Sequence, residues 1–84
     1  MKNNEVYKKK IIYRSMHRGS REMDLLLGNF VKKYIYEFNN NELQDLDELL
    51  SKEDEILYKW YFKNIHSKYI QDNKVSRMLK NFKI

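Results

Sequence analysis

Apolar residues recur every three or four positions along much of the chain, which is the pattern of helices with one buried face. The pattern is clearest over residues 23–38, where polar residues fill the remaining positions. The apolar positions are Met23, Leu26, Leu27, Phe30, Val31, Tyr34 and Phe38. We predict a helix over this stretch, ended by the three asparagines that follow it. Gly28 lies inside it and costs about 1 kcal/mol relative to alanine, so we expect a neighbouring helix to approach closely there.

Four other segments have a similar period over shorter lengths. Residues 5–17 form a loosely helical first segment, and Asn41 with Gln44 resembles a capping pair that begins a third helix. Ser51 is a candidate N-cap for a fourth helix, and Asp72 is a candidate cap for the last one. No useful length of chain alternates apolar and polar residues as a half-buried strand would. We therefore predict an all-α fold, a small compact antiparallel bundle of about five helices.

The composition limits the size of the core and the class of protein. The chain of 84 residues is predicted to form one domain, residues 1–84, with a thin core, since a chain this short buries only ~60–65% of the surface that unfolding exposes. It has no cysteine, which excludes disulfides and cysteine-ligated zinc. We find no secretory signal and no apolar run long enough to insert in a membrane, so the simplest location is a bacterial cytoplasm.

Charge is distributed unevenly along the chain. Residues 1–21 hold seven basic residues and one acid, residues 37–55 hold eight acids and one lysine, and residues 56–84 hold seven basic residues and one acid. Such a polarised molecule indicates a surface for docking to another protein. The net charge of +5 also fits an alternative, a small basic nucleic-acid-binding helical regulator. That alternative predicts binding that weakens steeply with salt, and we expect no nucleic-acid partner.

Few residues are suited to catalysis or metal binding. His17 and His66 are the only histidines, and no acid-rich metal spacing accompanies either one. We find no phosphate-binding loop and no arrangement of serine, histidine and aspartate, so we predict that the chain is not an enzyme. The aromatic residues of the fourth helical segment are expected to be mainly core. Tyr58 and Phe62 share a face of their own, which is a candidate exposed contact patch.

The motif Arg18-Gly19-x-x-Glu22 lies between the first two helical patterns. One interpretation is structural: Gly19 adopts left-handed backbone angles just past a helix end, and Glu22 lies in the first turn of the next helix. If Gly19 is itself the N-cap, Glu22 takes the third position of a capping box. The other interpretation is functional: the corner presents a guanidinium, bare backbone and a carboxylate on one exposed edge, which suits docking to another protein.

The motif and its surroundings resemble the succinate dehydrogenase assembly factor 2 family, whose bacterial members are called FAD assembly factor SdhE. Residues 18–30 are similar to the signature turn and second helix of that family. The acidic pair Glu53-Asp54, followed by Leu57 and Trp60, is similar to its second landmark. The likeness covers about residues 13–60 and is weaker over the last helix.

The resemblance implies a chaperone-like assembly factor that binds the flavoprotein subunit of succinate dehydrogenase and promotes covalent attachment of FAD to it. It implies no stably bound cofactor, and it leaves open whether fumarate reductase is a second client. We expect a monomer. The implied partner-binding residues are Arg18, Gly19 and Glu22, with Ser20, Arg21, Asp24 and His17 as neighbours.

Two expectations follow for this surface. Many relatives have a second arginine where His17 stands, so a contact made there is expected to be weaker or sensitive to pH. We also expect Gly19→Arg to leave the bundle folded and to abolish client binding. A second rival hypothesis, an inert structural partner of a larger complex with the turn merely a corner, predicts retained binding.

Overall fold

The computed structural model describes residues 4–83, and within that range it contains five α-helices, one short 3₁₀ turn and no strand. The helices are α1 (Asn4–Met16), α2 (Arg21–Tyr34), α3 (Asn40–Leu50), α4 (Asp54–Phe62) and α5 (Lys74–Asn81), and the turn η1 is Ile35–Glu37. The predicted all-α bundle of about five helices is therefore confirmed. Residues 1–3 and 84 of the predicted domain lie outside the described residues.

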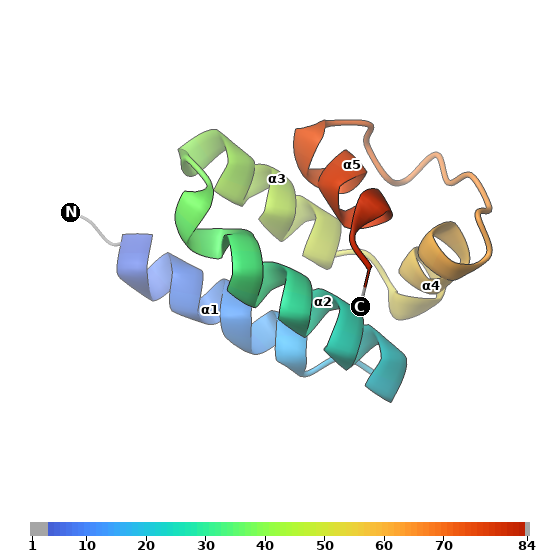
Figure 1. Cartoon of the computed structure of the whole chain (residues 1–84), viewed down its shortest axis with the longest axis horizontal. Helices are drawn as coiled ribbons and strands as arrows, with labels where there is room; N and C mark the ends of the chain where they lie inside the picture. The colour runs from blue at the N-terminus through green and yellow to red at the C-terminus, as the bar shows by residue number, and fades with distance from the viewer. Residues whose placement is uncertain (1–3, 84) are drawn as a thin grey trace.

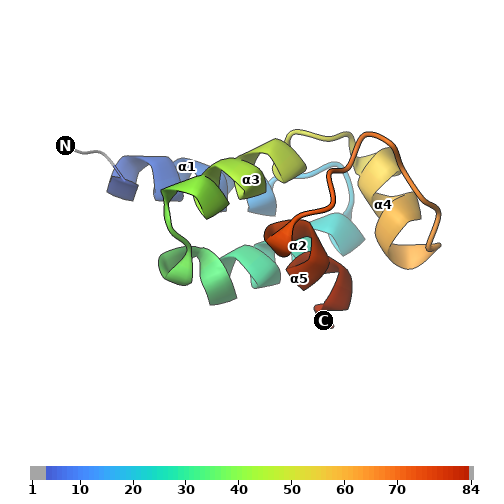
Figure 2. The same ribbon diagram turned by 90° about the horizontal axis from the view of Figure 1, so that it is seen from above.

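The first three helices run alternately in opposite directions and form the body of the molecule (Figure 1). Seen from above, α1 and α3 lie in one layer over α2 (Figure 2). Helix α5 packs against α3, and α4 lies at the end of the molecule to which the α1–α2 turn points. Within the described residues, none of the helices has the length and apolar character needed to cross a bilayer.

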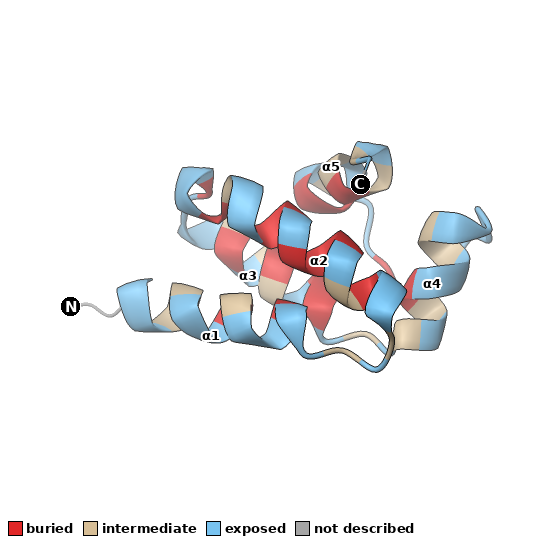
Figure 3. Cartoon of the chain, turned by 60° about the horizontal axis from the view of Figure 1, so that its bottom comes forward, coloured by how far each residue is buried: buried red, intermediate tan, exposed pale blue. Residues whose placement is uncertain are grey.

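The core lies between α2 and α3, whose inner faces are buried, whereas α4 is largely exposed or half-buried (Figure 3). Helix α4 contributes Leu57 as its one fully buried residue among those described. Because few contacts hold α4, the bonds at its first turn matter for its position. The buried apolar residues are Ile11, Met23, Leu26, Leu27, Phe30, Val31, Ile35, Phe38, Leu43, Leu46, Leu49, Leu50, Leu57, Ile70, Val75 and Leu79.

Helix α2 has the predicted buried face but is shorter than predicted. It ends at Tyr34, and the chain tightens into η1 before Phe38 adopts an extended conformation. Phe38 is nevertheless only 7% exposed, so the apolar period continues after the helix has ended. The prediction about Gly28 is confirmed, because a Cβ atom there would lie 3.3 Å from Met16 Cγ of α1.

Three predicted helix caps are wrong by one or two residues. Helix α3 is capped by Asn39, whose side chain accepts from the Glu42 backbone N–H at 2.8 Å while the Glu42 carboxylate accepts from the Asn39 N–H. Ser51 lies at the C-cap of α3 instead of starting α4. The fourth helix follows Glu53 without a side-chain cap bond.

The cap of the last helix is also displaced by one residue. Asn73 caps α5, and its side chain and that of Ser76 form a reciprocal capping box. Asp72, the predicted cap, instead forms an ion pair with Arg77 at 2.8 Å. For α3 and α5, the neighbouring residue whose side chain reaches a free backbone N–H takes the cap position.

Tyr7 links α1 to α3 by a hydrogen bond, and the stability that this bond contributes is lost at alkaline pH. Its hydroxyl donates to Asp47 Oδ2 at 2.9 Å. Burial, followed by the hydrogen bond to Asp47, raises the pKa of Tyr7 from 10.0 to about 12. An acid whose pKa is raised by folding stabilises the protein below its unfolded pKa, and that contribution is lost as the pH rises from about 10 to 12.

We expect Tyr7→Phe to lower the free energy of unfolding at pH 7 by about 1–2 kcal/mol, because the bond to a charged carboxylate is lost. The difference from the unmodified chain should then shrink as the pH rises above about 10. Urea unfolding measured from pH 7 to 12 checks this. Tyr36→Phe, at a tyrosine that is 62% exposed, serves as the control and should show neither effect.

Candidate functional site

Four residues, 17–20, join α1 to α2, and two backbone N–H groups that donate to side chains help to fix their path. The Arg18 N–H donates to Asp24 Oδ1 at 2.6 Å, and the Met23 N–H donates to Ser20 Oγ at 3.3 Å. Ser20 is the N-cap of α2. The alternative in which Gly19 is the N-cap and Glu22 completes a capping box is therefore wrong, because Glu22 is the second residue of the helix. The expectation that Glu22 lies in the first turn of this helix is confirmed.

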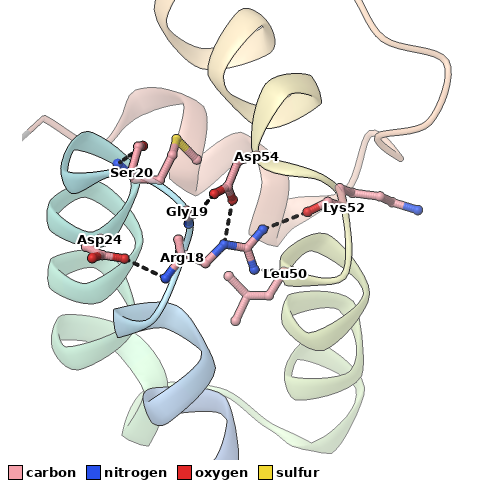
Figure 4. A network of polar contacts seen from close by, with 8 residues as sticks. Arg18, Gly19, Ser20, Asp24, Leu50, Lys52 and Asp54 are labelled. Atoms are coloured by element: carbon pink, nitrogen blue, oxygen red, sulfur yellow. Dashed lines mark hydrogen bonds and ion pairs between the residues drawn. The ribbon is translucent and has the colours of Figure 1, made fainter.

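The Arg18 guanidinium points inward and binds the segment between α3 and α4 (Figure 4). Its Nε donates to Asp54 Oδ1 at 2.8 Å, Nη1 donates to the Leu50 carbonyl at 2.6 Å, and Nη2 donates to the Lys52 carbonyl at 2.7 Å. The Arg18 side chain is 12% exposed. The expectation of an exposed guanidinium is therefore wrong, since the side chain satisfies carbonyls at the C-terminal end of α3 and holds the first turn of α4. Its assignment to a partner-binding surface stays a prediction.

Asp54 explains why a glycine occupies position 19. Its second oxygen, Oδ2, accepts a hydrogen bond from the Gly19 N–H (Figure 4). A Cβ atom at Gly19 would lie 2.8 Å from that oxygen, which is closer than real Cβ contacts allow. Left-handed backbone angles are not the reason, because Asn64 is the one described residue with a clearly positive φ, 56°. The expectation of a left-handed Gly19 is therefore wrong.

This geometry changes what a substitution of Gly19 tests. Any side chain at Gly19 displaces the Asp54 carboxylate, which also holds Arg18. We call the bonds that Arg18 and Gly19 make with the α3–α4 segment the joint between the two turns. Gly19→Arg would therefore disturb this joint as well as any contact with a partner. Exposed side chains outside the joint give a cleaner test.

The predicted site residues divide into two groups. Arg18 and Asp24 are used within the turn, and Ser20 is half-buried at the helix cap. Gly19, Arg21 and Glu22 are exposed, and neither Arg21 nor Glu22 forms an ion pair with another described residue. The outward-facing surface of the motif is therefore the Gly19 backbone with the side chains of Arg21 and Glu22.

His17 lies beside this surface and is held against α1. Its ring stacks on that of Tyr13 with 3.9 Å between ring centroids. Its Nδ1 lies 2.7 Å from the Tyr13 carbonyl oxygen. The side chain is exposed, and its role in binding a partner stays a prediction.

A hollow of about 550 Å³ opens between the first turn of α2 and one side of α4. We call it the α2–α4 groove. The candidate patch of Tyr58 and Phe62 is exposed in the structure: the two residues are 37% and 38% exposed, with ring centroids 4.8 Å apart. Ile65, 51% exposed, was missed because it follows the end of the helical pattern. The residues lining the groove are Ser20, Glu22, Met23, Asp54, Glu55, Tyr58, Lys59, Lys63 and Ile65.

Much of the positive charge near the C-terminal end is committed within the fold. Lys74 bonds Glu42 at 2.9 Å, and this bond, with that from the Asn39 N–H, lowers the pKa of the Glu42 carboxyl. Lys80 donates to the Trp60 carbonyl and lies over the Trp60 ring, 4.9 Å from its centroid. Burial, with a smaller effect of the Lys83 charge, lowers the pKa of Lys80. Lys80 therefore contributes to the packing of α5 against α4, whereas the Lys74 side chain stays 69% exposed beside Glu42.

A family described as "Flavinator of succinate dehydrogenase" matches residues 9–83. The chain belongs to this family. The resemblance drawn from the signature turn and the acidic landmark is therefore confirmed. In this member of the family, the Arg18–Asp54 ion pair joins the two landmarks directly.

Curated relatives agree with the family match. The succinate dehydrogenase assembly factor 2, mitochondrial, of Scheffersomyces stipitis is 42% identical over 77 residues, covering 90% of this chain and 52% of that protein. The protein of the same name from Debaryomyces hansenii is 38% identical over 77 residues, covering 90% and 54%. That of Saccharomyces cerevisiae is 37% identical over 77 residues, covering 87% and 48%. The chain spans about half the length of these relatives, and no solved structure matches it.

The names of these relatives correct one prediction. They are mitochondrial proteins of yeasts, so the expectation of a bacterial cytoplasmic protein is wrong. The error arose because the composition fits either compartment. The prediction rested only on the lack of a secretory signal and of a long apolar segment.

Proposed function

We propose that this protein is a mitochondrial assembly factor that binds the flavoprotein subunit of succinate dehydrogenase and promotes covalent attachment of FAD to it. The observation that carries the proposal is the family match over residues 9–83. The names of the relatives, succinate dehydrogenase assembly factor 2, agree with it. The contact surface in this proposal is the exposed part of the α1–α2 turn, with Gly19, Arg21 and Glu22 at its centre.

The geometry supports a binding role for that turn. Asp54 and Arg18 hold the turn against the α3–α4 segment through side-chain and backbone bonds. The exposed side chains therefore project from a fixed frame, which lowers the ordering cost of binding a partner. His17, at the edge of the same surface, is in position to add a contact.

A helper of this kind needs no catalytic side chain. Attachment requires the 8α-methyl carbon of the flavin and the acceptor imidazole of the client to be held in reactive geometry. A protein that binds preferentially the client conformation in which these atoms are aligned raises the population of that conformation and so speeds the reaction. We propose that this chain acts by such selective binding, without a stably bound cofactor of its own.

Covalent flavin on the client tests the proposal directly. We expect the purified flavoprotein subunit lacking FAD, mixed with FAD and a dicarboxylate, to gain covalent flavin several-fold faster when this protein is added. Flavin fluorescence on a denaturing gel measures the product. An equal concentration of heat-denatured protein is the control.

The opposite result would favour the alternatives. No gain in covalent flavin, together with no complex by gel filtration, would leave the family match without this activity in the chain. Binding to duplex DNA or to RNA that weakens steeply between 50 and 200 mM salt, roughly as the release of several counterions requires, would then support the nucleic-acid-binding regulator.

A further inference from the structure

The α2–α4 groove begins where the signature turn ends. Ser20 and Glu22, from the motif, form one wall, and α4 forms the other with Tyr58 and Lys59. Because the two surfaces share residues, a partner that contacts the exposed turn lies over the mouth of the groove.

The floor and one side of the groove are apolar. Met23 is fully buried and closes the floor, whereas Tyr58 and Ile65 leave 37% and 51% of their surface in solvent. Phe62 packs on Tyr58 and extends the apolar surface along α4. Large side chains exposed together beside a hollow mark a contact site more strongly than single exposed residues do.

The charged residues that line the groove differ in whether they already have a partner within the protein. Both oxygens of Asp54 are bonded, to Arg18 and to the Gly19 N–H, and Glu55 pairs with Lys59 at 3.1 Å. Of the charged lining residues, Glu22 and Lys63 remain without an ion pair to any other described residue. The groove therefore offers a negative charge on its α2 wall and a positive charge at the end of α4.

We propose that the groove binds a segment of the client flavoprotein that inserts a large apolar side chain between Glu22 and Lys63. The segment carries a basic residue on the side facing Glu22 and an acidic residue on the side facing Lys63, because only that order complements both charges. The volume of about 550 Å³ accommodates one such side chain and part of its backbone. This inference rests on the proposed function and names the chemistry by which the same surface selects its client.

Two matched pairs of variants test the groove. Ile65→Asp places a charge in it, and Val6→Asp makes the same change at an aliphatic residue of α1 with similar exposure, 54%. Tyr58→Ala removes one wall, and Tyr36→Ala truncates an exposed tyrosine in η1, outside the groove. Ile65 lies in the exposed segment after α4, so its substitution leaves the core intact.

The dissociation constant for the purified flavoprotein subunit lacking FAD, measured by biolayer interferometry, is the readout. We expect Ile65→Asp and Tyr58→Ala each to raise it by about tenfold or more, as truncation of a central contact residue does, and the two control variants to change it less than about twofold. Circular dichroism melts of all four variants establish that they are folded.

The outcomes separate the two proposals. If the unmodified protein binds the client and the groove variants bind equally well while folded, or if the control variants weaken binding as much, the groove proposal is overturned and the proposed function stands. If the unmodified protein fails to bind the client at all, the proposed function fails and the groove proposal with it. The groove proposal would also be overturned if a hydrophobic dye binds in the groove while Ile65→Asp and Tyr58→Ala leave the affinity for the client unchanged.

Discussion

Replacing Arg18 with methionine is expected to lower the free energy of unfolding by about 2–4 kcal/mol. The guanidinium makes three bonds to the segment between α3 and α4, to Asp54 and to the carbonyls of Leu50 and Lys52. Methionine fills similar space but donates no hydrogen bond, so it leaves a half-buried carboxylate and two carbonyls without this partner. Urea unfolding followed by circular dichroism at pH 7 measures the loss.

Arg14→Met is the matched control for that experiment. Arg14 also pairs with an aspartate of a distant segment, Asp47, but the two side chains are 43% and 31% exposed. Ion pairs in such positions contribute about 0–1 kcal/mol. A loss at Arg18 no greater than that at Arg14 would show that the inward guanidinium contributes little and that the turn is held by other contacts.

Arg18→Lys distinguishes charge from geometry. A lysine ammonium keeps the attraction to Asp54, but it lacks the planar fork that reaches three acceptors together. We therefore expect a loss of stability between those of the unmodified chain and of Arg18→Met. A lysine variant as unstable as the methionine variant would assign the whole effect to the fork and its two carbonyl bonds.

The parts of this fold that the sequence predicted depend on residues close together in the chain. The buried face of α2 follows from a period of three to four residues, and the close approach at Gly28 follows from a glycine in an otherwise good helix. The exposure of Tyr58 and Phe62 also follows from helical period, because they share a face that excludes Leu57. Local patterns therefore predicted both the number of helices and most of their faces.

The features that the sequence did not predict depend on residues far apart in the chain. Arg18 was expected to face solvent, yet its partner Asp54 lies 36 positions away. Gly19 was expected to need a left-handed backbone, whereas the same distant carboxylate lies 2.8 Å from where a Cβ atom would be and would have to shift to admit one. The groove likewise combines residues 20–23 with residues 54–65. No spacing rule relates such segments until the helices are packed.

The joint between the two turns also gives a physical reason for the two family landmarks to occur together. An arginine at the end of one turn and an acid at the start of α4 fix the distance between the walls of the groove. Loss of either residue would remove this restraint on α4, which buries only Leu57 among its described residues. Arg18 therefore supports a contact surface that other side chains form.

Glu22→Arg is expected to weaken binding of the flavoprotein subunit by about 30-fold or more, equivalent to about 2 kcal/mol or more of binding free energy. Glu22 is exposed, forms one wall of the groove and pairs with no other described residue. Reversing its charge opposes a basic residue of the client. Because the Ser20 cap is retained, the cost to stability should stay near 0.3–1 kcal/mol, the usual effect of an acid in the first turn of a helix.

Glu5→Arg provides the control, since it makes the same change in the first turn of α1, away from the groove. It should leave the dissociation constant within about twofold of the unmodified value. Equal weakening by both variants would mean that net charge, and not the position of Glu22, governs the encounter, and added salt would then remove the difference from the unmodified chain.

Covalent flavin formation with the Glu22→Arg variant separates a binding role from a catalytic one. If the protein acts only by binding the reactive conformation of its client, the variant should be slow at low concentration and should approach the unmodified rate once its concentration exceeds the raised dissociation constant. A group that took part in the chemical step would lower the rate even at saturation. Full rescue by concentration therefore supports an assembly factor that acts by binding, and a persistent deficit at saturation would place Glu22 in the reaction itself.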